Sequence, residues 1–166
     1  MAVAAAIALV AVLLIRGGEG ESEPQRTAAE TVSVEELRAL PASAGHPVYW
    51  AGEQTGTKLE LSQTGDGSIY IRYLPRDAEA GDPRPDFLTV GTYPEGDAVE
   101  VVRGSAKHVD AAVERVRGGG VAYADPENPG TVFLAYPSSQ FAIEVYDPSP
   151  RRALELVESG TIQPVS

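Results

Sequence analysis

The chain opens with an unbroken apolar run and only later alternates between apolar and polar positions. Residues 1–15 carry no charge and no polar side chain. As a helix this run would span about 22 Å, against roughly 30 Å of bilayer hydrocarbon, so it fits a thin membrane anchor, a signal-peptide core or a buried helix. It shows neither the basic region before it nor the small-residue cleavage motif after it that mark a secretory signal. We therefore expect an uncleaved membrane anchor over residues 1–15.

A polar segment separates this run from the rest of the chain. Residues 16–32 are rich in Gly, Glu, Ser and Pro and offer no apolar face, which predicts a disordered tether. Only Arg16 and Arg26 are basic near the run, so the distribution of positive charge gives little guidance on orientation. An N-terminal anchor followed by an acidic tether favours a single-pass protein with most of the chain outside the cytoplasm.

The globular domain is expected over residues 33–166, and its first element is a short helix. Ser33 and Glu36 have the spacing of a capping box, and Val32 and Leu37 occupy the two positions of a hydrophobic staple. Because Pro41 disfavours helical geometry at the residue before it, we expect this helix to end at Leu40.

Alternating hydrophobicity and turn residues predict most of the remaining elements. Glycines in residues 64–67 predict a hairpin between two alternating strands, and glycines at 118–120 predict a second one. Capping residues predict helices over residues 98–107 and 150–159, the second with Pro150 at its first position and ended by Gly160. The predicted strands cover residues 47–51, 58–63, 68–74, 87–93, 112–117, 121–124, 132–137 and 141–148.

These elements predict an α+β fold. A strand that ends in Tyr and Pro recurs in both halves, and each half closes with a helix, which suggests a duplicated β-β-α unit. We expect two layers, a largely antiparallel sheet with the helices on one of its faces.

Composition narrows the range of partners. The 166 residues have a formal net charge of -11, which opposes binding to nucleic acid, so no nucleic-acid partner is expected. The absence of cysteine removes disulfides, thiol nucleophiles and cysteine zinc sites.

The polar residues form no motif for catalysis, cofactors or metals. His46 and His108 lack the spacing of metal ligands, and the triple glycine precedes a valine-rich strand where a phosphate loop would precede a helix. Four acids lie close together without the order of a calcium loop, namely Asp77, Glu79, Asp82 and Asp86. We expect neither a cofactor nor a metal ion.

Aromatic residues are the one candidate for recognition. Tyrosine and tryptophan suit surfaces where a ring meets apolar atoms and its polar tip meets water, although tyrosine also suits half-buried strands. We expect a ligand or partner surface at Tyr49, Trp50, Tyr70 and Tyr73.

Three function classes remain open. The favoured one is a non-catalytic, membrane-anchored extracytoplasmic domain that binds a protein or an envelope polymer. The second is a structural or assembly subunit of a membrane complex, with residues 1–15 packed against partner helices. The third is a cell-envelope hydrolase that uses carboxylates, with Asp82, Asp86 and Asp110 as candidates.

Overall fold

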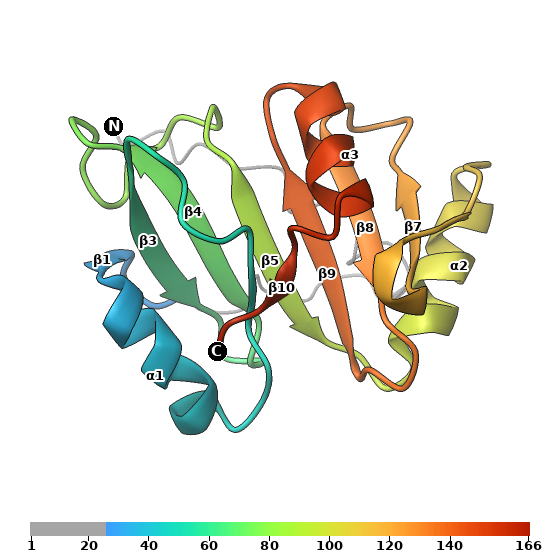
Figure 1. The fold of residues 1–166 in the computed structure, drawn as a ribbon, viewed down its shortest axis with the longest axis horizontal. Coiled ribbons are helices and arrows are strands. Elements are labelled where there is room, and N and C mark those ends of the chain that lie inside the picture. Colours follow the sequence, from blue (N-terminus) through green and yellow to red (C-terminus); the bar gives the residue numbers. More distant parts are fainter. Residues whose placement is uncertain (1–25) are drawn as a thin grey trace, which may run out of the picture.

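The structure is a computed structural model that describes residues 26–166, and it has the α+β fold that the sequence predicts (Figure 1). The expected anchor at residues 1–15 and the first part of the expected tether, residues 16–25 of 16–32, lie outside the described part. Within residues 26–166, no helix is both long enough and apolar enough to cross a bilayer.

One antiparallel sheet of eight strands forms the body of the domain, in the order β1-β3-β4-β5-β9-β8-β7-β6. A separate two-stranded sheet pairs the C-terminal segment with the start of the domain. The strands of the large sheet are β1 (Glu30–Val32), β3 (Thr57–Gln63), β4 (Ile69–Pro75), β5 (Thr89–Pro94), β6 (Glu114–Arg115), β7 (Val121–Ala124), β8 (Thr131–Ala135) and β9 (Phe141–Tyr146). Those of the small sheet are β2 (Tyr49–Trp50) and β10 (Gln163–Pro164).

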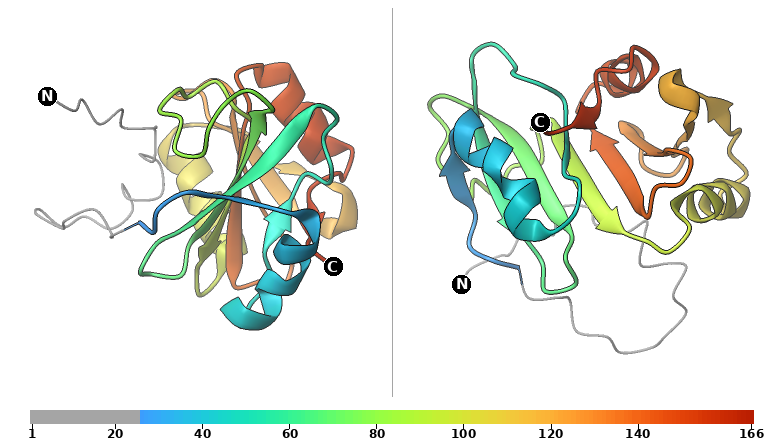
Figure 2. Two further views of the ribbon diagram at one scale, coloured as in Figure 1. Left: turned by 90° about the vertical axis from the view of Figure 1, so that its left-hand side faces the viewer. Right: turned by 60° about the horizontal axis from the view of Figure 1, so that its bottom comes forward.

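The helices cover both faces of the large sheet, so the expectation of helices on one face is wrong. Seen along the sheet in the left view of Figure 2, α2 (Ala98–His108) lies on one side, and α1 (Val34–Ala44) and α3 (Pro150–Glu158) lie on the other. The small sheet lies on the side of α1 and α3, where Thr92 Oγ1 of β5 accepts a hydrogen bond from the backbone of Tyr49. The domain therefore has three layers: α2, the large sheet, and the layer of α1, α3 and the small sheet. The strands of the large sheet bury side chains on both faces.

Strand β8 illustrates why both faces need cover. Phe133 packs in the cluster beneath α2, while its neighbours Val132 and Leu134 pack in the main core with α3. Since successive side chains of a strand point to opposite faces, a fully apolar strand must be covered twice.

Helix α1 starts as predicted but runs past Pro41. Both hydrogen bonds of the capping box are present between Ser33 and Glu36, and Leu37 is fully buried. Pro41 removes only the hydrogen bond that its missing N–H would have donated, and one more turn follows it. The helix ends where Gly45, in the left-handed conformation, donates its N–H to the carbonyl of Pro41 at 3.0 Å.

The end of the predicted tether is part of the sheet. The backbone N–H of Thr27 donates to the carbonyl of Gln63 at 2.7 Å, and β1 then pairs with residues 59–61 of β3. Backbone pairing at a sheet edge requires no apolar side chains, so the polar composition of this segment did not reveal it.

The two predicted β-β-α units appear as two hairpins, each followed by a helix. β4 and β5 lead to α2, β8 and β9 lead to α3, and β5 pairs with β9 at the centre of the sheet. A two-fold axis through that antiparallel pair would place both helices on the same face. Because α2 and α3 lie on opposite faces, the halves do not form such a symmetric pair.

Candidate functional site

The four aromatic residues proposed from the sequence are buried and lie on two faces of the sheet. Their exposed fractions run from 3% to 9%. Tyr49, Trp50 and Tyr73 belong to the core on the side of α1 and α3, whereas Tyr70 lies in the cluster beneath α2. The structure therefore does not bring them together on one exposed surface.

Tyr49 nevertheless lines an open groove with a volume of about 490 Å³, which we call the Tyr49 groove. The groove lies where the C-terminal segment passes the turn between β6 and β7. Its lining consists of Tyr49, Arg117, Gly118, Tyr136, Ser159, Gly160, Ile162, Gln163 and Pro164.

Two tyrosine rings form the apolar part of the groove. Tyr49 is held on β2, opposite Pro164 of β10, and Tyr136 follows directly after β8. The ring centroids lie 5.9 Å apart with an interplanar angle of 14°, and the hydroxyl of Tyr136 donates to the carbonyl of Ile162 at 3.1 Å. Burial, followed by the neighbouring Tyr49, raises the pKa of Tyr136.

The glycine turn fits closely against Tyr136. A Cβ atom at Gly118 would lie 3.2 Å from Cε1 of Tyr136, and one at Gly120 would lie 2.9 Å from the carbonyl oxygen of Ala135. Gly118 also has a φ of 78°, which a side chain would disfavour. The triple glycine thus forms a turn, as predicted, and it also allows the backbone to approach the groove.

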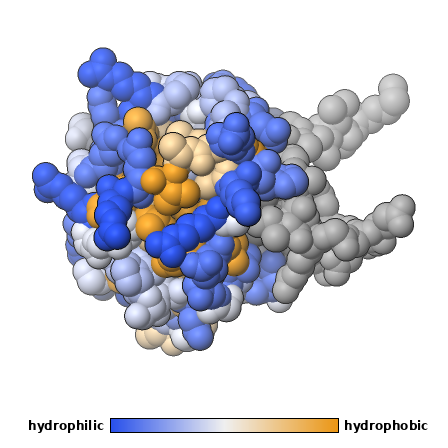
Figure 3. All heavy atoms as spheres, turned by 90° about the vertical axis from the view of Figure 1, so that its right-hand side faces the viewer, coloured by the Kyte–Doolittle hydropathy of each residue, from blue (hydrophilic) through white to orange (hydrophobic). Residues whose placement is uncertain are grey.

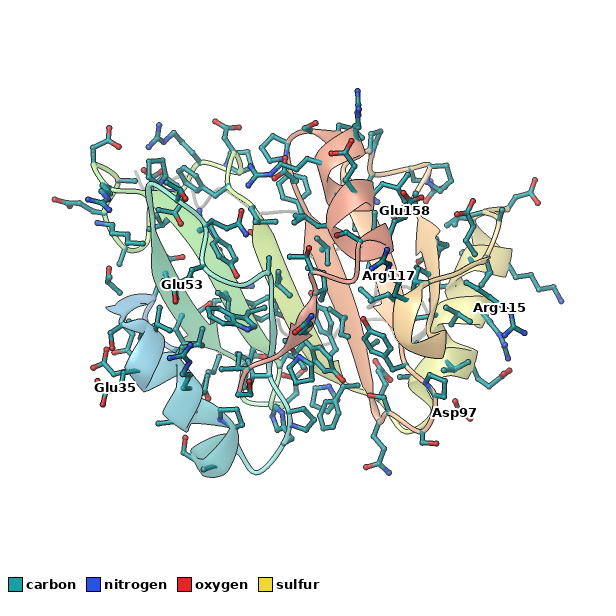
Figure 4. The ribbon with its side chains drawn as sticks, viewed as in Figure 1. Glu35, Glu53, Asp97, Arg115, Arg117 and Glu158 are labelled. Carbon is teal, nitrogen blue, oxygen red and sulfur yellow. The ribbon has the colours of Figure 1, made fainter. Side chains whose placement is uncertain are left out.

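Arg117 supplies the positive charge of the groove. Its stem lies across Gly160, where an added Cβ would come within 3.2 Å of Cδ of Arg117. Among residues 26–166 the guanidinium has no ion-pair or hydrogen-bond partner, and all the other lining residues are uncharged. Figure 4 shows Arg117 near the end of α3, well apart from Arg115.

Tyr49 adds a hydroxyl group that is available to a ligand. The hydroxyl oxygen of Tyr49 makes no hydrogen bond within the described part of the chain. It is also not fully enclosed by protein atoms, so it is accessible to solvent. The phenol therefore reaches the groove even though the residue is only 6% exposed.

A second hollow, at the start of α2, carries both signs of charge. It is lined by Asp97, Glu100, Arg103 and Arg115, and Arg103 is already paired with Glu100 at 2.9 Å. Figure 4 shows Asp97 and Arg115 on this side of the molecule. The mixture of signs makes this hollow a weaker binding site than the Tyr49 groove.

The carboxylates suggested for a hydrolase do not converge. Asp82 and Asp86 lie on the loop between β4 and β5, while Asp110 follows α2 at the other end of the sheet (Figure 1). Hydrogen bonds from Arg84 lower the pKa of Asp82 to about 2, so this carboxyl is ionised at neutral pH. Within residues 26–166, no cluster of His, Asp and Glu has the geometry of a metal site.

One unusual carboxyl group, that of Glu144 on β9, was not predicted from the sequence. Burial raises its pKa to about 7, and the hydroxyl of Tyr93 donates a hydrogen bond to it. Glu144 lines neither the Tyr49 groove nor the hollow at the start of α2. The available signal in the sequence was a single charged residue within an otherwise apolar strand. A strand that is covered on both faces has no solvent-facing side for such a charge.

The chain shows no similarity to known proteins that would identify it: no family model, no curated protein and no solved structure matches it. The candidate site therefore rests on the geometry of the Tyr49 groove.

Proposed function

We propose that this chain is a non-catalytic binding domain that is anchored in a membrane by residues 1–15 and binds acidic sugar units of an envelope polymer in the Tyr49 groove. The observation that carries the proposal is the guanidinium of Arg117, which lies beside the tyrosine pair and, among residues 26–166, has no ion-pair partner and no carboxylate next to it in the groove.

The size of the groove suits a ligand of one or two rings. Small-molecule sites usually enclose roughly 300–1,000 Å³, and this groove holds about 490 Å³. It is open to solvent along one side, as a site for part of a polymer has to be.

The chemistry of the lining favours a sugar acid over a neutral ring. The tyrosines provide apolar contact and a free hydroxyl, and Arg117 can bind a carboxylate or phosphate with two parallel hydrogen bonds. The whole chain has a net charge of -11, so an acidic polymer would be repelled unless a local cation drew one unit into the groove.

Binding of defined oligosaccharides tests the ligand class. Tri-galacturonate and its methyl ester have the same rings but differ in charge, and both can be titrated into the full-length protein by calorimetry. We expect the acid to bind at least tenfold more tightly than the ester. Equal affinities, or no binding of either this acid or a phosphorylated trisaccharide, would contradict the proposal.

Two arginine variants distinguish binding of the acid in the Tyr49 groove from nonspecific attraction to any positive charge on the surface. Arg117→Gln should weaken binding of the acid at least tenfold, because it removes the cation of the groove. Arg115→Gln removes the same charge from an exposed residue of the hollow at the start of α2 and should leave the affinity within twofold. Trp50, the only tryptophan of the chain, pairs with Gln163 of the groove, so its fluorescence offers a second readout.

The location is tested separately. A reporter at the C-terminus that is active only outside the cytoplasm should be active, and the full-length protein should remain with the membrane after a carbonate wash. Recovery of the protein in the aqueous fraction would exclude the anchor while leaving the ligand proposal intact.

A further inference from the structure

A second surface of the domain lies at the β6 edge of the large sheet, away from the Tyr49 groove. β6 is the outermost strand and pairs only through Glu114 and Arg115, opposite Ala122 and Val121 of β7. The β6–β7 pairing stops there. Ala124 at the other end of β7 is exposed and pairs with Val132 of β8, but no strand within residues 26–166 pairs with it on its outer side. The sheet thus ends in an incomplete edge that has backbone groups available for pairing.

An apolar hollow lies beside this edge, on the face covered by α3. Its volume is about 240 Å³. The apolar part of its lining consists of Ala111, Ala112, Val116, Ala122, Ala124, Pro126, Val132, Leu154 and Val157. Val113 lies in the chain between Ala112 and Glu114 of the lining, and it is the one large hydrophobic residue among residues 26–166 that is substantially exposed, at 40%. Figure 3 shows apolar side chains gathered on this side of the molecule and surrounded by hydrophilic ones.

Carboxylates form the charged part of the rim. Asp110, Glu114 and Glu158 line the hollow, and in the described part of the chain none of them has an ion pair. Figure 4 shows Glu158 at the end of α3. The hollow therefore has an acidic rim, whereas the charged residue of the Tyr49 groove is an arginine.

We infer that the β6 edge binds an extended peptide segment of a partner protein, with an aliphatic side chain in the hollow and lysine or arginine residues beside it. The hollow is smaller than most small-molecule sites but has room for one or two side chains. In such β-strand addition, backbone hydrogen bonds give affinity and pockets for alternate side chains give specificity.

The acidic rim selects this occupant over two others. A second copy of the chain would bring two acidic rims together, and anionic lipid headgroups would be repelled in the same way. A basic and aliphatic segment is attracted by the carboxylates and also fills the apolar hollow.

Three synthetic peptides test the inference. The probe has the sequence Lys-Lys-Val-Thr-Leu-Thr-Val-Lys-Lys, the second peptide has glutamate in place of each lysine, and the third is the probe with alternate backbone nitrogens methylated. Each is titrated into the isotope-labelled full-length protein in mild detergent and followed by NMR. We expect the probe to shift the amide signals of residues 110–116, 121–124 and 154–158, and each of the other peptides to bind at least tenfold more weakly.

Charge-reversal variants locate the site. Glu114→Lys and Glu158→Lys are exposed changes at the rim, and together they should weaken binding of the probe at least tenfold. Glu53→Lys is the control, a charge reversal at another exposed residue on the other side of the molecule (Figure 4), and should alter the affinity less than twofold, whereas each rim variant alone should weaken binding more than twofold.

Several results would overturn the inference. They are equal binding of the lysine and glutamate peptides, an equally large effect of Glu53→Lys, signal shifts confined to the Tyr49 groove, or sedimentation and amide-exchange data showing that a second copy already covers the β6 edge.

Discussion

Tyr93 donates a hydrogen bond to the carboxylate of Glu144 across the central strand pair of the sheet. The contact depends on Gly91, which lies directly opposite Glu144 in the pairing of β5 with β9. Because Gly91 has no side chain, the ring of Tyr93 can lie over it and reach the next strand. Tyr70 packs edge-on against Tyr93 with centroids 5.6 Å apart, so the carboxylate lies in a largely aromatic environment.

Glu144 should make the stability of the domain depend on pH near neutrality. Burial raises its pKa to about 7 in the folded state, above the usual value of 4.5. A raised pKa contributes stability that is complete below about pH 4.5 and is lost as the pH rises through 7. At about 1.4 kcal/mol per unit of pKa, the loss approaches roughly 3 kcal/mol. Denaturant unfolding of the full-length protein between pH 5 and pH 8.5 measures it.

Glu144→Gln provides the control for this pH dependence. The amide oxygen can still accept a hydrogen bond from Tyr93, but the side chain does not titrate. We expect the free energy of unfolding of the variant to vary less between pH 5 and pH 8.5, and the variant to be the more stable protein at pH 8.5. Parallel curves for the two proteins would show that Glu144 titrates normally.

Gly91→Ala should disrupt the contact between Tyr93 and Glu144. The added Cβ would lie 2.8 Å from the hydroxyl oxygen and 2.9 Å from Cε2 of Tyr93, so the ring must move. Overpacking of this kind costs about 1–3 kcal/mol. Chemical denaturation gives the stability, and the pH dependence of the variant should also change because the hydrogen bond to Glu144 is strained.

Gly104→Ala is the matched substitution, with the opposite expected sign. Gly104 lies inside α2 and an added Cβ meets nothing within 4 Å. Since glycine in a helix is about 0.5–1 kcal/mol less favourable than alanine, this variant should be more stable than the parent protein. A destabilised Gly104→Ala variant would mean that other atoms lie closer to Gly104 than the structure indicates.

Local sequence rules were sufficient for the elements whose signals lie within a few residues. The hairpin of β3 and β4, the capped start of α1 and the helix α3 with its proline at the first position were all predicted from neighbouring residues. The antiparallel sheet and the α+β class followed from these elements. Caps, turns and alternation act over short distances, so a single sequence contains them in full.

The layer arrangement could not be predicted, because it depends on which face each helix covers. All five residues of β8 are buried, so the strand carries no alternation that distinguishes one face from the other. The same limitation applied to the aromatic residues. Tyr70 and Tyr73 were grouped by composition, although their positions on β4 place them on opposite faces.

The sequence predicted only one residue of the Tyr49 groove. Tyr49 was named, but Tyr136 and Arg117 are distant in sequence and meet it only through the fold. The pairing of β2 with β10 brings the C-terminal segment to the groove, and two-residue strands give almost no signal in a sequence. Functional residues that are assembled from several short elements are therefore the ones that a single sequence conceals.

A buried ion pair provides the last prediction. Arg72 of β4 and Glu60 of β3 are direct cross-strand partners, joined at 2.7 Å, and Glu60 is only 1% exposed. The pair also holds the loop between β4 and β5, because Arg72 donates to the carbonyls of Asp82 and Arg84 at 2.9 Å. Arg72→Leu would leave the carboxylate of Glu60 buried without its cation, which typically costs about 3–5 kcal/mol.

A double-mutant cycle measures this coupling. Glu60→Leu together with Arg72→Leu removes both charges, so the double variant should be more stable than the Arg72→Leu variant. Arg103→Leu is the control, since its pair with Glu100 is exposed and should contribute less than about 1 kcal/mol. If Arg72→Leu destabilised the protein no more than Arg103→Leu, water would have to reach Glu60 in solution, and the loop between β4 and β5 would not cover this end of the sheet as closely as the structure indicates.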